Sequence, residues 1–287
     1  MKFTKTFGIF FLTFIIGCGL AFSTQMKSQN LKKNANKTIA PKVVTKEIKP
    51  IKIKTVTKPK VLNVDDFHKQ GNKDVNTQFI EIGEVTNFEE FKVKSGESWF
   101  GFFKENGNEV IRKTKIKLKK KSELDLDWTD INITDTKRPA FLVKSIRGVK
   151  KGKVETVFRG KNWIENMENN EGTEIKYGFF KKLQINDAEY IFRTEKRVSE
   201  DGDDLFVLLL EKGGQSQVIT FVYTGGEDTP LGTLYWAGDI DNDGKLDFYM
   251  DFWGYEKGGY SSSLFVSSEA EKRKLVKEFG NFMLGGC

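Results

Sequence analysis

The stretch "TLYWAGDIDNDGKLDFYMDF", Thr233–Phe252, decides the fold class of the chain. After its central aspartates, apolar residues alternate with polar or aromatic ones: Leu246, Phe248, Met250 and Phe252 against Asp247, Tyr249, Asp251 and Trp253. A period of two is the pattern of a β-strand, because successive side chains point to opposite faces of a sheet. The stretch therefore predicts two strands joined by a short acidic loop.

The same period of two continues outward from this stretch. Three dipeptides predict tight turns between alternating segments: Asn106-Gly107, Asn186-Asp187 and Gly213-Gly214. No long amphipathic helix is predicted, and the closing segment 271–284 favours a strand over a helix. We therefore expect a mainly β fold with an antiparallel, β-sandwich-like body. A polar stretch near residues 160–172 leaves open whether the body is one unit or two small β domains, 75–160 and 161–287.

The N-terminal residues 1–23 have the layout of a secretory signal peptide, with Lys2 and Lys5 ahead of an apolar run. The segment "IIGC", which ends at Cys18, is similar to the bacterial lipobox, in which the cysteine is lipidated and becomes the new N-terminus. Ordinary cleavage after Ser23 is the alternative. An uncleaved anchor is disfavoured, because sixteen apolar residues are short of the roughly 20 that span a bilayer. Each reading places the body outside the cytoplasm, as a membrane-anchored lipoprotein or a secreted protein.

Residues 24–74 are predicted to be a disordered tether, since they are rich in lysine and hold three of the five prolines. Residues 26–60 alone carry eleven lysines against one glutamate, whereas the whole chain has a net charge of +7. The remaining body is therefore mildly acidic, and the basic balance belongs to the tail. A nucleic-acid-binding domain carries its positive charge on a face of the fold, so we expect no nucleic acid as partner.

One basic run lies in the body itself, "RKTKIKLKKK" from Arg112 to Lys121. Ile116 and Leu118 alternate with lysines in this run, which predicts a strand with one charged face. We interpret it as an edge strand whose lysines discourage pairing with other chains, rather than as a site for a polyanion.

The acidic loop has the spacing of a calcium site. Counted from Asp239 as position 1, its carboxylates fall at positions 1, 3, 5 and 9: Asp239, Asp241, Asp243 and Asp247. Gly244 permits a sharp turn, and the backbone carbonyl of Lys245 would supply another oxygen to a cation that takes roughly six to eight. Without a cation, carboxylates this close would repel one another and have raised pKa values. The alternative is a hairpin turn at Asn242-Asp243-Gly244 with surface acids.

The loop, residues 239–251, resembles the calcium loop of integrin-propeller (FG-GAP) and VCBS-type repeats, and less closely that of dockerin modules. The resemblance implies a calcium ion that fastens a β-loop through the matching residues Asp239, Asp241, Asp243 and Asp247. It departs from an EF-hand, since position 12 is Met250 rather than glutamate. The motif does not repeat along the chain, so a full propeller is not expected. Asp251 on the following strand is a further candidate ligand.

The sequence nominates no catalytic residue. The single histidine, His68, lies beside the tether, which argues against a catalytic triad and against histidine-based zinc chemistry.

We therefore expect an exported cell-envelope protein that acts as a binding or scaffold module. Its expected partner is a glycan or another envelope protein, and lipid on Cys18 would attach it to the membrane. Trp253 and Tyr255, which follow the loop, are candidates for stacking on sugars; Cys287 has no assigned role. The alternative is an extracellular hydrolase, for example a carbohydrate-active one, whose catalytic carboxylates the sequence does not identify.

Overall fold

Strands β15 (Gly232–Asp239) and β16 (Asp247–Trp253) form the predicted hairpin on either side of the acidic loop. The computed structural model describes residues 60–64, 78–86, 92–123, 126–161, 172–226, 229–253 and 260–284. Within these ranges the protein is mainly β and its sheets are largely antiparallel, as predicted. The predictions for the signal peptide, Cys18, His68, Tyr255, Cys287 and most of the tether fall outside the described residues, as does the side chain of Trp253.

The acidic hairpin belongs to a six-stranded sheet, which we call the middle sheet. Its strand order is β10-β15-β16-β17-β18, with β9 beside β15. The other strands are β9 (Glu155–Arg159), β10 (Thr173–Ile175), β17 (Tyr260–Val266) and β18 (Lys277–Leu284). β18 confirms the strand predicted for the closing segment. Because β15 and β16 lie inside this sheet, the acidic loop is held between two paired strands.

A five-stranded sheet has the order β1-β12-β13-β14, with β11 beside β12. Its strands are β1 (Val61–Leu62), β11 (Phe180–Ile185), β12 (Ala188–Ser199), β13 (Asp204–Lys212) and β14 (Gln215–Tyr223). The turns at Asn186-Asp187 and Gly213-Gly214 are confirmed, since Ile185 pairs with Ala188 and Lys212 with Gln215. β1 runs parallel to β12. β1 lies within the segment 24–74 that was predicted to be a disordered tether. These residues are ordered because Leu62 covers an apolar cluster on β13.

A seven-stranded sheet has the order β2-β7-β4-β5-β6-β3, with β8 beside β5. Its strands are β2 (Phe79–Ile80), β3 (Gly83–Thr86), β4 (Ser98–Glu105), β5 (Asn108–Glu123), β6 (Leu126–Ile133), β7 (Leu142–Val143) and β8 (Gly152–Lys153). The predicted turn at Asn106-Gly107 joins β4 to β5. β5 lies between β4 and β6 in the strand order, but β4 pairs with Asn108–Lys115 and β6 with Ile116–Glu123. Among the described residues the basic run is therefore neither a simple edge strand, as predicted, nor paired on both sides along its length. Alternation of lysine with apolar residues marks a solvated face, and such a face is equally available to an interior strand.

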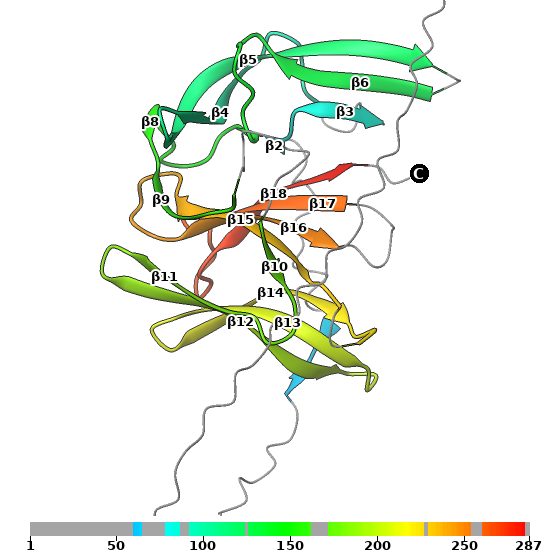
Figure 1. Ribbon diagram of the computed structural model, residues 1–287, viewed down its shortest axis with the longest axis vertical. Helices are drawn as coiled ribbons and strands as arrows, with labels where there is room; N and C mark the ends of the chain where they lie inside the picture. Colours follow the sequence, from blue (N-terminus) through cyan, green and yellow to red (C-terminus); the bar gives the residue numbers. More distant parts are fainter. Residues whose placement is uncertain are drawn as a thin grey trace, which may run out of the picture. The chain divides into compact units, whose positions relative to one another are not determined.

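Both faces of the middle sheet are buried, and Figure 1 shows this sheet between the other two. Trp236 and Tyr249 face the seven-stranded sheet, where they join Phe102 and Phe141 in one hydrophobic cluster. Phe248, Met250 and Phe265 face the five-stranded sheet and join Phe192, Phe206 and Leu208 in a second cluster. Burying each of these large side chains contributes roughly 1.5–3 kcal/mol. The two clusters together hold the acidic hairpin from both sides.

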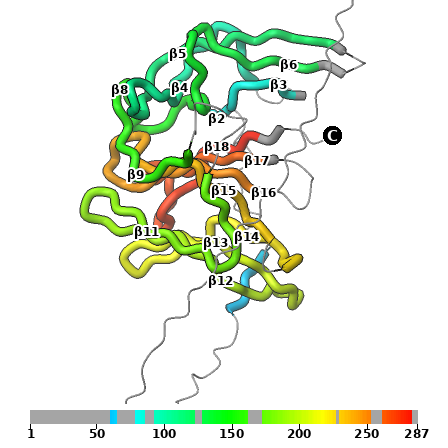
Figure 2. The backbone as a smooth tube through the Cα atoms, in the orientation of Figure 1, coloured from blue at the N-terminus to red at the C-terminus, as the bar shows by residue number. Residues whose placement is uncertain are grey.

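The chain passes from the seven-stranded sheet into the middle sheet over a very short distance. In the backbone trace of Figure 2, β8 lies beside β5 and is followed directly by β9 beside β15. The first cluster accordingly contains side chains from residues 79–154 and from residues 235–282. The division into domains 75–160 and 161–287 stays a prediction, but these two segments share a core. Among the described residues, no helix has the length and hydropathy to cross a membrane.

Candidate metal centre

The acidic loop is anchored at both of its ends. Asp239 closes β15 and Asp247 opens β16, where it pairs with Gly238. The neighbouring Ile240 and Leu246 are fully buried and enter the two different hydrophobic clusters. Gly244 has a φ of 79°, in the left-handed region that glycine adopts without strain, so the predicted sharp turn is present. The apolar anchors therefore set where the aspartates must lie.

Three carboxylates meet inside this loop. One oxygen from each of Asp239, Asp241 and Asp247 lies within 4.8 Å of the others. The residues are only 4%, 3% and 0% exposed. Burial, with a smaller contribution from the negative charge of Asp243, raises the pKa of Asp241 to about 6. Burial also raises the pKa of Asp247 well above its ordinary value, with the charge of Asp241 as the next cause. A bound cation would favour the ionised carboxylates and so lower both pKa values.

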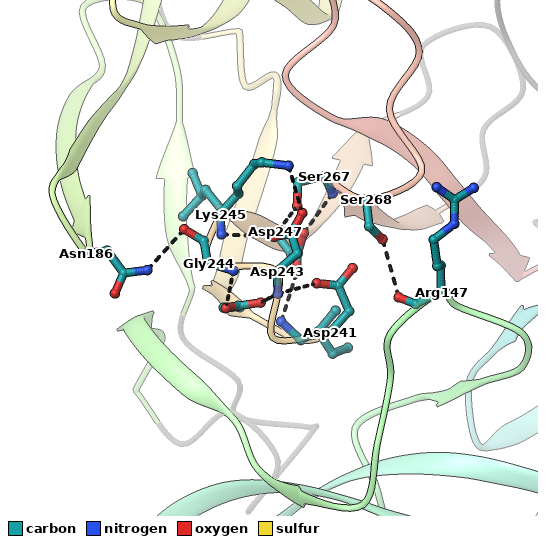
Figure 3. A network of polar contacts seen from close by, with 12 residues as sticks. Arg147, Asn186, Asp241, Asp243, Gly244, Lys245, Asp247, Ser267 and Ser268 are labelled. Carbon is teal, nitrogen blue, oxygen red and sulfur yellow. Dashed lines mark hydrogen bonds and ion pairs between the residues drawn. The ribbon is translucent and has the colours of Figure 1, made fainter.

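Backbone amides orient two of the three carboxylates (Figure 3). Asp239 accepts hydrogen bonds from the N–H of Asp243 at 3.0 Å and of Gly244 at 2.8 Å. Asp247 accepts hydrogen bonds from the N–H of Ile240 at 2.8 Å and of Ser267 at 2.7 Å. Because amides at fixed places in the loop hold these oxygens, the carboxylates are preorganised rather than free to turn towards solvent.

Asp241 is held differently. Its Oδ1 accepts a hydrogen bond from the Asp243 N–H at 3.1 Å. Its Oδ2 is buried and has no hydrogen-bond partner among the described residues. A buried polar atom left without a partner costs about 1–3 kcal/mol, and the cost is larger for a charged group. A bound cation would satisfy this oxygen, so its position points to a ligand independently of the spacing of the aspartates.

Asp243 lies beside the group of three and is not part of it. Its Oδ1 accepts from the Lys245 N–H at 2.9 Å and from Ser267 Oγ at 3.0 Å, and its Oδ2 pairs with Lys245 Nζ at 3.0 Å. The hydrogen bond to Asp243 raises the pKa of Lys245. Of the five predicted ligands, the structure thus brings three together, and ligation by Asp243 and by the Lys245 carbonyl stays a prediction. Asp251 is also outside the group and accepts a hydrogen bond from Tyr235.

The structure adds contacts from β17 and from the turn after β7, which spacing within the loop does not indicate. Ser267, just after β17, contacts both Asp247 and Asp243. Ser268 donates to the Arg147 carbonyl at 3.4 Å, and Gly148 has a φ of +86°. A Cβ atom on Gly148 would lie 2.9 Å from the Asp241 carbonyl oxygen, so a residue without a side chain is required there. The hydroxyl-rich run 261–268 is the one sequence signal that could have indicated such contacts.

The hairpin between β11 and β12 also contacts the loop. Asn186 Nδ2 donates to the Gly244 carbonyl at 3.1 Å, and Figure 3 shows this side chain reaching the loop from its own turn. Tyr190 Oη accepts a hydrogen bond from the Leu246 N–H at 3.4 Å. These residues are separated from their partners by 58 and 56 positions, so no local motif could have identified them.

Comparison of the chain with protein-family models, with curated proteins and with solved structures finds no match. The resemblance to FG-GAP, VCBS-type and dockerin repeats therefore stays a prediction, and it is limited to the acidic loop. The fold and the geometry define a mainly β protein with a buried group of three carboxylates that could hold a metal ion.

Proposed function

We propose that this chain is an exported cell-envelope protein that acts as a binding or scaffold module and carries a structural calcium ion in the acidic loop. The observation that carries the metal site is the buried Asp241 Oδ2, which has no hydrogen-bond partner among the described residues and lies beside two further buried carboxylates. Export is supported by the signal-like N-terminal segment.

Calcium is the cation that this donor set favours. The group consists of carboxylates alone, without histidine or cysteine, whereas zinc sites are built mainly from those two residues. Magnesium keeps several of its waters and requires near-ideal octahedral geometry. Calcium accepts irregular sets of carboxylate and carbonyl oxygens, and Asp243 and the Lys245 carbonyl are the additional donors that the loop spacing predicts. We therefore assign Asp239, Asp241 and Asp247 as the first three calcium ligands.

A structural role is favoured over a catalytic one. A catalytic metal keeps a coordination position open to substrate or water. Here the three carboxylates are at most 4% exposed, and the loop that carries them is pinned at Ile240 and Leu246. The ion would therefore stabilise the fold, while partners bind elsewhere on the surface.

Thermal melting with calcium and with chelator tests this proposal. In the Asp241→Asn variant, an amide nitrogen replaces the unpartnered oxygen while Oδ1 can still accept from the Asp243 N–H. Calcium at about 100 times its Kd should stabilise the wild type by about 2.7 kcal/mol, which is roughly 5–10 °C for a chain of this size. The variant should lose this shift. Asp201→Asn, at an exposed aspartate, is the matched control and should keep it.

Two results would refute the calcium site. One is an identical melting temperature in chelator and in calcium for the wild type, with no ion retained after gel filtration. The other is an equal calcium response in Asp241→Asn and wild type. Magnesium at the same concentration should give a smaller shift than calcium. Membrane attachment is tested separately by metabolic labelling with a fatty acid, which Cys18→Ser should abolish if the lipobox is used.

A further inference from the structure

A row of lysines at alternate positions runs along one face of β5. Alternate residues of a strand share a face and lie about 6.7 Å apart, so the five lysines extend over about 27 Å. The members of this lysine row are Lys113, Lys115, Lys117, Lys119 and Lys121. The first four are exposed to solvent, and Lys121 is half-buried. Such a row is unexpected on a body whose overall charge is mildly acidic.

The pairing of β5 accounts for only part of this charge. β4 pairs with Asn108–Lys115 and β6 with Ile116–Glu123, so each lysine of the row has a ladder partner on one side among the described residues, and its charge also discourages pairing with other chains. Lys115, Lys117 and Lys119 form no ion pair with the described residues. Like charges in a line repel one another; Glu84 pairs with Lys121 at one end of the row, and an anion would relieve the repulsion among the other lysines.

The lysine row is one residue wide. On β4, the residues opposite Lys115 and Lys113 are Ser98 and Phe100. On β6, Asp130 lies opposite Lys119, and Glu84 of β3 lies opposite Asp130. A flat anionic surface such as a membrane would meet these acids as well as the lysines. A linear polyanion could follow the row and avoid them.

An aromatic residue lies near each end of the row. Phe100 pairs with Lys113, whose ammonium lies 5.7 Å from the ring centroid. Trp128 pairs with Lys121 at the other end. Both aromatic side chains are half-buried, so part of each remains available for apolar contact. Sugar rings have apolar faces that pack on such side chains, whereas a chain of phosphates or carboxylates without rings has none.

We propose that this face of the seven-stranded sheet binds a linear anionic polysaccharide. The lysine ammonium groups neutralise the charges along the polymer, and Phe100 and Trp128 contact its sugar rings. Lysine suits this task because its ammonium is a point charge on a flexible stem that requires no bidentate geometry. The inference rests on the proposed binding role and names its class of partner. It does not depend on calcium, because no residue of the row belongs to the acidic loop.

Polygalacturonate, a linear polymer of carboxylated sugars, is the probe. The row variant Lys115→Gln/Lys117→Gln/Lys119→Gln is compared with the control variant Lys137→Gln/Lys150→Gln/Lys151→Gln, whose lysines are also exposed. Both variants remove three charges from the full chain and leave the basic tail intact. The affinity of the row variant should fall about tenfold or more in low salt, and the slope of log affinity against log salt should decrease by roughly 2 to 3. The control should change much less.

Each alternative outcome contradicts the proposal. Equal losses of affinity in both variants would show that net charge alone attracts the polymer. Absence of binding by the wild type would refute an anionic polysaccharide as the partner. Stronger row-dependent binding to phosphatidylglycerol vesicles or to single-stranded DNA than to polygalacturonate would assign the face to a membrane or a nucleic acid. Uncharged dextran should not bind. Repeating the titration in chelator separates this proposal from the calcium site, whose failure appears in melting and leaves polymer binding unchanged.

Discussion

Glu81 and Asp251 place two further carboxyl groups in the interior, away from the acidic loop. They are 5% and 1% exposed. Tyr249 and Ser262 donate hydrogen bonds to Glu81. Burial raises the pKa of Glu81, although these two hydrogen bonds and the positive charge of Arg138 act to lower it. Burial also raises the pKa of Asp251 to about 8; the hydrogen bond from Tyr235 opposes this, and the charge of Glu81 adds to it. At neutral pH the folded protein therefore keeps a proton on Asp251.

Stability should consequently fall as the pH rises through the neutral range. Asp251 has a folded-state pKa of about 8, above its unfolded value near 4, so the folded state binds more protons between these two values. The contribution of this group is complete below about pH 4, declines as the pH approaches 8 and is lost above it. We expect the free energy of unfolding to decrease by several kcal/mol at most over this interval. Urea unfolding in saturating calcium, at several pH values, measures it.

Asp251→Asn is the control for this pH dependence. The amide cannot titrate, so the curve of unfolding free energy against pH should become flatter between about pH 4 and 8. A variant curve parallel to that of the wild type would show that Asp251 is not the responsible group. Saturating calcium is needed because Asp241 and Asp247 would otherwise add a pH dependence of the same sign.

At the scale of elements, one glutamine connects β14 of the five-stranded sheet to the segment that leads into β18. Gln217 Oε1 accepts from the N–H groups of Leu275 at 2.7 Å and Val276 at 3.1 Å, and its Nε2 donates to the Val276 carbonyl at 2.9 Å. These backbone groups form the approach to the middle sheet. The glutamine side chain thus makes the hydrogen bonds to Leu275 and Val276 that the backbone of a neighbouring strand would otherwise make.

Gln217→Ala should destabilise the protein by roughly 2–4 kcal/mol, because it leaves three partly buried backbone groups without their partner. Gln215 is the matched control on the same strand, since it makes one exposed hydrogen bond to the Arg273 carbonyl. Gln215→Ala should cost less than about 1 kcal/mol. Chemical denaturation of both variants measures the difference, and equal losses would mean that the Gln217 bonds are replaced by water at little cost.

Elements whose signal is local could be predicted from the sequence, and elements defined by distant partners could not. Asn106 and Gly107 adopt φ angles of 51° and 79°, as a tight hairpin turn of this sequence requires. The change of partner along β5, from β4 at Asn108–Lys115 to β6 at Ile116–Glu123, depends on distant segments, which no alternation within β5 encodes. The two residues of β1 are too few to produce a periodic pattern.

The same distinction applies within the metal centre. Spacing along one loop was enough to predict Asp239, Asp241 and Asp247 as ligands, and the structure brings these three together. Ser267 and Asn186 reach that loop only because other strands carry them there, so the sequence did not indicate them. Asp243 fits the spacing equally well, yet it pairs with Lys245, a cation that the loop itself supplies.

At the scale of the whole molecule, the acidic loop of the middle sheet is a junction between the three sheets. It contacts the β11–β12 hairpin through Asn186 and the turn after β7 through Gly148. Ser267, after β17, contacts it from within the middle sheet. Because these contacts depend on one loop conformation, an ion that fixes the loop should stabilise segments far apart in the chain.

Hydrogen exchange with and without calcium tests this coupling. In chelator we expect faster exchange first at the amides that donate to the carboxylates, those of Ile240, Gly244 and Ser267. The increase should extend to the turn at 147–148 and to the hairpin around 186–190, because local opening spreads through contacts. The amides of residues 115–119 in β5 should keep their protection, which distinguishes local loosening from global unfolding. Asp241→Asn should show the chelator pattern even in calcium. Acceleration confined to 240–246 would instead mean that the ion organises its own loop without linking the sheets.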